Sequence, residues 1–271
     1  MNTQLELFND GPIKKALVVL SGGQDSTTCL FWALAQWAEE IHAVTFDYNQ
    51  RHRREIEAAK KVAELAGVAS HEIIELGPVL KGSSPLVSGN ELEQYADHQS
   101  LPGGLEKTFV PMRNQMFLTI AANRAYVLGC DTLITGVCEE DFGGYPDCRQ
   151  SFIDKFVEAC NEGTFTGQDG ANGPLKIATP LMYLTKAASV DLALELPGCY
   201  EALMWSHTSY DGQYPPVGHD HATLLRAKGF EEAGVPDPLV LRAIQEGVME
   251  VPSSPNYSSD MMETYNEALG F

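Results

Sequence analysis

The sequence predicts an α/β fold in which a mostly parallel sheet of about five strands is flanked by helices. Three observations lead to this prediction. Short β-branched apolar runs alternate with amphipathic segments over the first 76 residues, in the order strand, helix, strand, helix, strand. A glycine pair directly follows the first of these runs. The chain has 271 residues and an apolar content of 44%, enough for a substantial core.

The first five elements follow each other closely. Residues 15–20 (KALVVL) predict a buried strand, and residues 25–40 predict a helix that begins near Asp25 or Ser26. Residues 41–48 predict a second strand, residues 53–67 an amphipathic helix ended by Gly67, and residues 71–76 a third strand. Consecutive strand–helix–strand units favour parallel pairing.

The later elements are separated by longer loops. Residues 76–107 are polar and rich in Gly, Ser and Pro, which is typical of a lid or binding loop. A helix is expected at 112–129, a strand at 131–136, a helix at 150–163, and a short strand and helix within 175–196. Loop 137–149 leaves the carboxyl end of a strand, where open sheets bind ligands. We predict an N-terminal arm (1–13), a nucleotide-binding and catalytic domain (14–196) and a C-terminal extension (197–271).

Charge and cysteine usage restrict the partners. The net charge of −19 repels polyanions, so we expect no nucleic-acid partner, and residues 49–55 (NQRHRRE) are interpreted as a charged helix start. The six cysteines are scattered without a CxxC pair, which favours reduced thiols in the cytoplasm. No apolar window approaches the roughly 18 residues of a membrane span, so no membrane partner is expected.

The segment SGGQDS (residues 21–26) lies between a predicted strand and a predicted helix. Such a turn lets backbone N–H groups and the helix dipole bind an anion, and nearby hydroxyl groups add donors. No lysine follows the second glycine, so the segment is not a GxxxxGK[ST] loop, and it is not GxGxxG either. The residues alone leave two interpretations open, a phosphate-binding loop of another type and a plain turn.

SGGQDS resembles the PP-loop of the ATP-pyrophosphatase superfamily, whose members cleave ATP between the α- and β-phosphates. Four further segments follow in order: TFDYNQRH (45–52), TFVPMRN (108–114), LITGVCEEDFGGYPDCR (133–149) and TPLMYLTK (179–186). Over residues 14–235 the five motifs together resemble the 7-cyano-7-deazaguanine synthase (QueC) family. The resemblance implies an adenine nucleotide α-hydrolase-like, Rossmann-like three-layer fold.

The resemblance also implies an activity. The family converts 7-carboxy-7-deazaguanine and ammonia to 7-cyano-7-deazaguanine (preQ0) by successive adenylations, with ATP and Mg²⁺, in queuosine biosynthesis, and a homodimer is expected. Two alternatives stay open: a paralogue that adenylates a deazaguanine to modify a protein or nucleic acid, and a non-catalytic nucleotide-binding module. A tRNA thiolase or lysidine synthetase is a more distant alternative, because it would favour a basic surface.

Site residues are carried over from the motifs. The expected catalytic residues are Ser21, Asp25, Ser26, Arg113 and Lys186. The expected nucleotide-binding residues are Leu20, Ser21, Gly22, Gly23, Gln24, Asp25, Ser26, Thr27, Thr28, Cys29, Leu30, Asp47 and Tyr48. The expected substrate-binding residues are Phe109, Arg113, Asp141, Phe142, Gly144, Tyr145, Asp147 and Arg149. A carboxylate, Asp141 or Asp147, suits the N–H donors of a deazaguanine, and an aromatic ring suits its face.

The chain departs from the family pattern near its C-terminus. The family carries four zinc-binding cysteines there, whereas residues 206–230 contain none. The flanking sequence places other residues at these positions: Ser209, Val217, Asp220 and Thr223. We therefore expect no zinc site and assign no metal ligand, although His207, His219 and His221 beside Asp220 leave a different metal site as an alternative. Asn49 stands where the family more often has glycine.

Overall fold

The computed structural model describes residues 13–36, 38–51, 53–101, 106–139, 145–164, 173–251 and 259–270. Within these ranges, five strands form one sheet in the order β3-β2-β1-β4-β5, and all neighbouring strands are parallel. The strands are β1 (Lys15–Val19), β2 (Glu40–Asp47), β3 (Ser70–Glu75), β4 (Thr132–Ile134) and β5 (Lys176–Ala178). The predicted parallel α/β fold is thereby confirmed.

Helices connect the strands and continue beyond them. The helices between strands are α1 (Gln24–Ala35), α2 (Arg54–Ala66), the short α3 (Pro85–Ser88), α4 (Arg113–Leu128) and α5 (Gln150–Gly163). The helices after β5 are α6 (Lys186–Glu195), α7 (Cys199–Leu203), α8 (His221–Ala233), α9 (Pro238–Gln245) and α10 (Ser259–Leu269). Among the described residues, 3₁₀ turns occur at His98–Ser100 and Pro146–Cys148. No described helix is long and apolar enough to cross a membrane.

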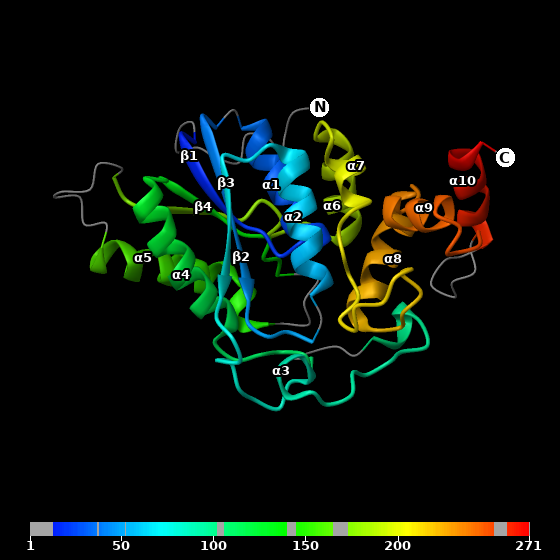
Figure 1. Ribbon diagram of the computed structural model, residues 1–271, viewed down its shortest axis with the longest axis horizontal. Coiled ribbons are helices and arrows are strands. Elements are labelled where there is room, and N and C mark those ends of the chain that lie inside the picture. Colours follow the sequence, from blue (N-terminus) through cyan, green and yellow to red (C-terminus); the bar gives the residue numbers. More distant parts are fainter. Residues whose placement is uncertain are drawn as a thin grey trace.

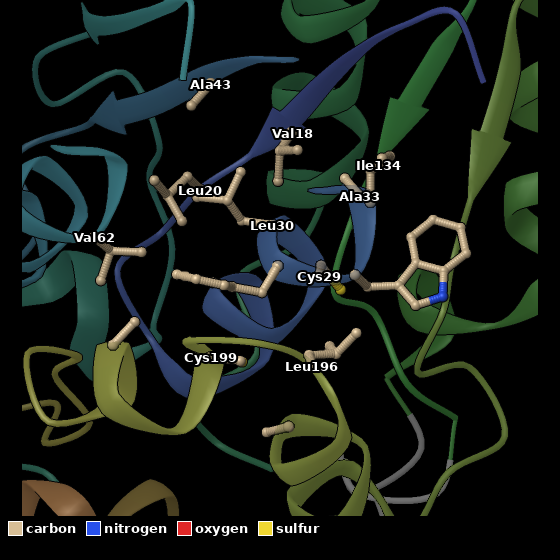
Figure 2. Close-up of a cluster of buried hydrophobic side chains, with 14 of the residues drawn as sticks. Val18, Leu20, Cys29, Leu30, Ala33, Ala43, Val62, Ile134, Leu196 and Cys199 are labelled. Atoms are coloured by element: carbon tan, nitrogen blue, oxygen red, sulfur yellow. The ribbon is translucent and has the colours of Figure 1, made fainter. Parts of the chain in front are cut away.

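Two hydrophobic clusters cover the two faces of the sheet. Side chains of a strand alternate between faces, so Val18 packs with α1, α2, α6 and α7, whereas Leu17 packs with α4 and α5. Figure 1 shows these two helical layers on opposite sides of the strands. Figure 2 shows Val18 and Leu20 meeting Leu30 of α1, with Cys199 of α7 on the far side. The three-layer arrangement follows from this alternation.

The strand order creates a crevice beside β1. This strand pairs with β2 on one side and β4 on the other, so the chain leaves β1 and β4 toward different sides of the sheet. The loops after these two strands touch, because a Cβ atom on Gly136 would lie 3.1 Å from the backbone carbon of Asp25. A ligand site is expected at such a switch point, and the glycine permits the close approach.

The C-terminal helices pack against the sheet domain. Helix α8 contacts α6, and α7 contacts α1 and α2. The buried Arg226 of α8 binds Asp237 through Nε and Nη2 at 2.7 and 2.8 Å and Ser206 Oγ through Nη1 at 2.7 Å. The predicted boundary at residue 197 stays a prediction. The connection between β3 and α4, which contains α3, runs along the lower edge of the molecule in Figure 1.

Candidate active site

A cavity of about 270 Å³ opens at the carboxyl ends of the strands. The loop after β1, the end of β2, the first turns of α2 and α4, and the loop after β4 contribute its walls. Among the predicted residues, its lining includes Leu20, Ser21, Gly23, Gln24, Asp25, Ser26, Tyr48, Arg113 and Tyr145. Residues from five separate segments therefore meet at one place, as the switch-point geometry requires.

The SGGQDS loop is held in shape by its own serines. The Ser21 N–H donates to Ser26 Oγ at 3.2 Å, and the two hydroxyls lie 3.0 Å apart. Gly22 has φ +88°, and a Cβ atom there would lie 2.2 Å from the Glu55 carbonyl oxygen. Only glycine fits this position without displacing α2. The N-cap of α1 is Gly23, so the helix begins at Gln24, and its N-terminus points toward the same cavity.

Lys186 reaches this loop from a distant part of the chain. Its Nζ lies 2.8 Å from Asp25 Oδ1 and 3.0 Å from Oδ2, and only 8% of its side chain is exposed. Gly229 of α8 makes room for it, because a Cβ atom there would lie 2.4 Å from Lys186 Cγ. The structure thus places Lys186 behind Asp25, next to the cavity lining. A catalytic role for Lys186 and Asp25 stays a prediction.

Arg113, the first residue of α4, provides a positive charge in the cavity wall. It hydrogen-bonds the Tyr48 hydroxyl, and the burial of that hydroxyl raises the pKa of Tyr48. Burial would lower the pKa of Arg113, but the neighbouring Tyr48, Tyr210, Tyr145 and Asp147 raise it on balance. The guanidinium therefore stays charged in an enclosed setting, which suits a phosphate or carboxylate ligand.

Several cavity residues are absent from the predicted set, and Glu55 and Tyr210 are two of them. Glu55 lies in the first turn of α2, and burial raises its pKa to about 7, with Arg113 lowering and Asp220 raising it. Tyr210 lies in the irregular stretch before α8 and lines the same cavity. A glutamate in a first helical turn resembles an ordinary partner of the helix dipole, so its sequence context carries no special signal. Tyr210 follows no recognisable motif.

The predicted base-binding residues are only partly described. Asp141, Phe142 and Gly144 lie outside the described residues. Tyr145 is buried, lines the cavity and shares a 2.6 Å hydrogen bond with Thr108 Oγ1. Phe109 packs against Tyr145, with ring centroids 5.2 Å apart. Of the predicted substrate residues, Arg113 and Tyr145 line the cavity among the residues described.

Three other predicted residues have different surroundings. Asp147 is buried, and burial raises its pKa while Arg113 lowers it. Arg149 is exposed before α5, and Asp47 accepts a 2.7 Å hydrogen bond from Arg53 at the surface. Asp47, Asp147 and Arg149 are not part of the described cavity lining. Asn49 has φ +61°, a conformation that asparagine adopts more readily than most other non-glycine residues.

The region expected to replace a zinc site forms a hydrogen-bonded network around Asp220. Asp220 Oδ2 accepts from Ser209 Oγ at 3.1 Å and from Thr223 Oγ1 at 2.9 Å, and Oδ1 accepts from the Thr223 N–H at 3.1 Å. Val217 contributes only hydrocarbon. The hydroxyls are engaged by the carboxylate and hydroxyls rarely bind zinc, so these residues do not fit a zinc ion.

The nearby histidines each face a different partner. His207 Nε2 lies 2.9 Å from the Ser209 carbonyl oxygen, and His219 Nδ1 lies 2.9 Å from the Tyr95 carbonyl oxygen. His221 Nε2 lies 3.5 Å from Glu106 Oε1. Within the described part of the chain, no group of three or more His, Cys, Asp or Glu side chains converges on a point.

The fold and the site together indicate the class of protein to which the chain belongs. A parallel sheet with a serine- and glycine-rich loop at its switch point, leading into a helix N-terminus beside enclosed cationic side chains, is typical of an α/β protein that binds nucleotide phosphates. The family described as "Queuosine biosynthesis protein QueC" matches residues 15–234. The chain belongs to this QueC family, the 7-cyano-7-deazaguanine synthases of queuosine biosynthesis, which use ATP.

Curated relatives match over nearly their whole length. The 7-cyano-7-deazaguanine synthase of Gloeobacter violaceus is 53% identical over 84% of this chain and 96% of its own. The synthase of Chromobacterium violaceum is 47% identical over 88% of this chain and 98% of its own.

Solved structures give weaker matches. The U34-tRNA thiolase NcsA from Methanococcus maripaludis has 16% identity, a TM-score of 0.39 and coverage of 88% of this chain and 73% of its own. The NMN synthetase from Francisella tularensis has 14% identity, a TM-score of 0.32 and coverage of 94% and 84%. The family assignment does not depend on either.

Proposed function

We propose that this chain converts 7-carboxy-7-deazaguanine and ammonia to 7-cyano-7-deazaguanine, with two molecules of ATP cleaved to AMP and pyrophosphate. The observation that carries the proposal is the SGGQDS loop opening into a cavity that also contains the partly buried Arg113, in a chain of the QueC family. A carboxylate is a poor electrophile because oxide is a poor leaving group. Transfer of AMP to that oxygen supplies a good leaving group and allows ammonia to attack.

The described residues suit the parts of this reaction. The loop N–H groups and the N-terminus of α1 would bind the phosphates that leave as pyrophosphate. Arg113 would bind the carboxylate or the adenylate by a bidentate contact. Lys186 binds both carboxylate oxygens of Asp25 and so fixes this residue at the base of the loop. Mg²⁺ would neutralise charge on the leaving pyrophosphate.

A product assay tests the proposal. The purified chain is incubated with ATP, Mg²⁺, ammonium and 7-carboxy-7-deazaguanine, and the products are identified by mass spectrometry. The expected result is the free nitrile, with AMP and pyrophosphate released only when the deazaguanine is present. An enzyme that consumes the deazaguanine only with a protein or nucleic-acid acceptor would be a paralogue. Binding of ATP without substrate-dependent turnover would indicate a nucleotide-binding module.

The assembly and setting of the enzyme are further parts of the proposal. We expect a homodimer, as the family resemblance implies, which sedimentation of the purified chain can test. None of the six cysteines forms a disulfide bond, and we propose a cytoplasmic enzyme. Because the residues around Asp220 do not fit a zinc ion, we propose that the enzyme carries no structural zinc.

A further inference from the structure

The nitrogen atom of the proposed reaction enters as ammonia with three hydrogens and ends in a nitrile with none. When ammonia adds to the acyl carbon, AMP leaves with the carbon–oxygen bonding pair and the nitrogen releases one proton. The amide oxygen then attacks the α-phosphorus of a second ATP, pyrophosphate leaves with its bonding pair, and the nitrogen releases another proton. In the last step the carbon–oxygen bond breaks, AMP leaves, and the third proton is released. A proton acceptor is therefore needed beside the reacting carbon.

The described cavity lining offers few acceptors for these protons. It contains no histidine, and its carboxylates are Asp25 and Glu55. Asp25 already has both carboxylate oxygens engaged as acceptors by Lys186 Nζ, at 2.8 and 3.0 Å. The lining also contains three tyrosines, Tyr48, Tyr145 and Tyr210. Burial raises the pKa values of these tyrosines, so they stay protonated. Glu55 is the carboxylate that remains.

The position of Glu55 is fixed by close packing. Its carbonyl oxygen lies against Gly22, where any Cβ atom would come within 2.2 Å, so the first turn of α2 is locked onto the loop. Its carboxylate lines the cavity and accepts no hydrogen bond from any described residue. The charged and titratable groups that act on it are Arg113 of α4, Asp220 at the start of α8, Tyr48 after β2 and Tyr210. Arg51 lines the same cavity.

We propose that Glu55 is the general base that accepts the nitrogen protons during amide formation and dehydration, an inference that rests on the proposed function. Its carboxylate is unbound, faces the cavity and is carried by a helix packed directly on the phosphate loop. Burial raises the pKa of Glu55 to about 7, so a proton acceptor is available at neutral pH and the proton can also be released again. An ordinary exposed glutamate would be too weak a base for this step.

The test uses the amide intermediate as the starting substrate, because this half of the reaction needs no ammonia. The rate of nitrile formation from the 7-carboxamide and ATP is measured from pH 5.5 to 9 for the wild type, for Glu55→Gln and for Glu57→Gln. Glu57 is the matched control, since it lies on the same helix but is exposed and pairs with Lys60 at 2.8 Å. Pyrophosphate exchange with the 7-carboxylate is measured in parallel, because adenylation of a carboxylate moves no nitrogen proton.

We expect the wild type and Glu57→Gln to lose activity as the pH falls below about 7. Glu55→Gln should lower kcat by about 10²–10⁴-fold and lose this acidic limb, while pyrophosphate exchange stays within a few-fold of the wild type. A raised KM with an unchanged pH profile would show that Glu55 instead binds the deazaguanine base. Loss of pyrophosphate exchange would show that Glu55 acts in nucleotide binding. Either result overturns the inference, as does an unaffected variant. Failure of the wild type to form nitrile would overturn the proposed function itself.

Discussion

Lys186 carries a positive charge that the fold encloses almost completely. Its hydrogen bonds to Asp25 join residues 161 positions apart in the chain and connect α6 to the phosphate loop. The favourable interaction offsets the cost of burying both charges, so the loss of one partner leaves the other uncompensated. Asp25 borders the cavity, so water moderates that cost.

We therefore expect Lys186→Met to lower the free energy of unfolding by about 1–3 kcal/mol and to weaken ATP binding. Urea unfolding and a nucleotide titration measure the two effects. The double variant Lys186→Met with Asp25→Asn should recover part of the lost stability, because it removes the unpaired carboxylate. Lys228→Met is the matched control, since Lys228 is exposed and pairs with Glu232 at 3.7 Å. Equal effects of the two methionine variants would contradict this interpretation.

Glu55 should affect stability in the opposite direction from a paired carboxylate. Its pKa in the fold, about 7, lies above its value in the unfolded chain, so the folded protein binds the extra proton and stability falls as the pH rises toward 7. The cost of its charge is present above that range and absent below about pH 4. Glu55→Gln should then stabilise the protein by about 1–3 kcal/mol at pH 8.

The same variant should show little gain at pH 5. Denaturant unfolding at the two pH values measures the difference, with Glu57→Gln as the control that should show no such change. Stabilisation that is equal at both pH values would mean that charge burial is not its cause.

At the scale of elements, periodicity and motif spacing predict the strands, the main helices and the phosphate loop. The runs KALVVL and DTLITG lie in adjacent parallel strands, β1 and β4, as their β-branched composition favours. The surroundings of Asp25 could not be predicted, because a helix N-terminal aspartate is usually a local cap. Its partner is set by the packing of α6 on α8, where Gly229 leaves space for Lys186. A contact between residues so far apart in the chain leaves no signal in the local sequence.

The start of α8 is held by hydrogen bonds to a buried carboxylate, in a region where the family carries zinc-binding cysteines. Asp220 is its N-cap and is only 2% exposed. Its two oxygens bind Thr223 and Ser209, which ties the irregular stretch 206–220 to the helix. A buried carboxylate with these donors can fix the loop without a metal ion.

Substitutions at Asp220 should have graded effects. Asn keeps an acceptor for the Thr223 N–H but presents an amide group to the two hydroxyls, so Asp220→Asn should cost about 1–2 kcal/mol. Asp220→Ala leaves buried donors unsatisfied and should cost about 2–4 kcal/mol. Thermal unfolding with and without a chelator measures both effects, and the chelator should not change the melting temperature of the wild type. Bound zinc in elemental analysis, or a chelator-sensitive melting temperature, would contradict a metal-free region.

At the scale of the whole molecule, the charges of the surface and of the site oppose each other. The chain has a net charge of −19, yet its cavity is expected to bind ATP and a carboxylate. The long-range field repels these anions during approach, whereas Arg113 and the helix N-terminus act only at short range inside the cavity. Salt screens the two contributions unequally, because the Debye length falls from about 30 Å at 0.01 M to about 8 Å at 0.15 M.

The KM for ATP should therefore fall as the salt concentration rises over this range, since the repulsion is screened more than the contacts inside the cavity. The KM for ammonium should rise, because the same field attracts a cation. Steady-state kinetics at fixed Mg²⁺, with sodium chloride as the added salt, measure both. Opposite slopes for the two substrates distinguish a surface field from a general effect of salt on the enzyme, which would move both constants in one direction. A KM for ATP that rises with salt would mean that the cations of the cavity, not the acidic surface, dominate nucleotide capture.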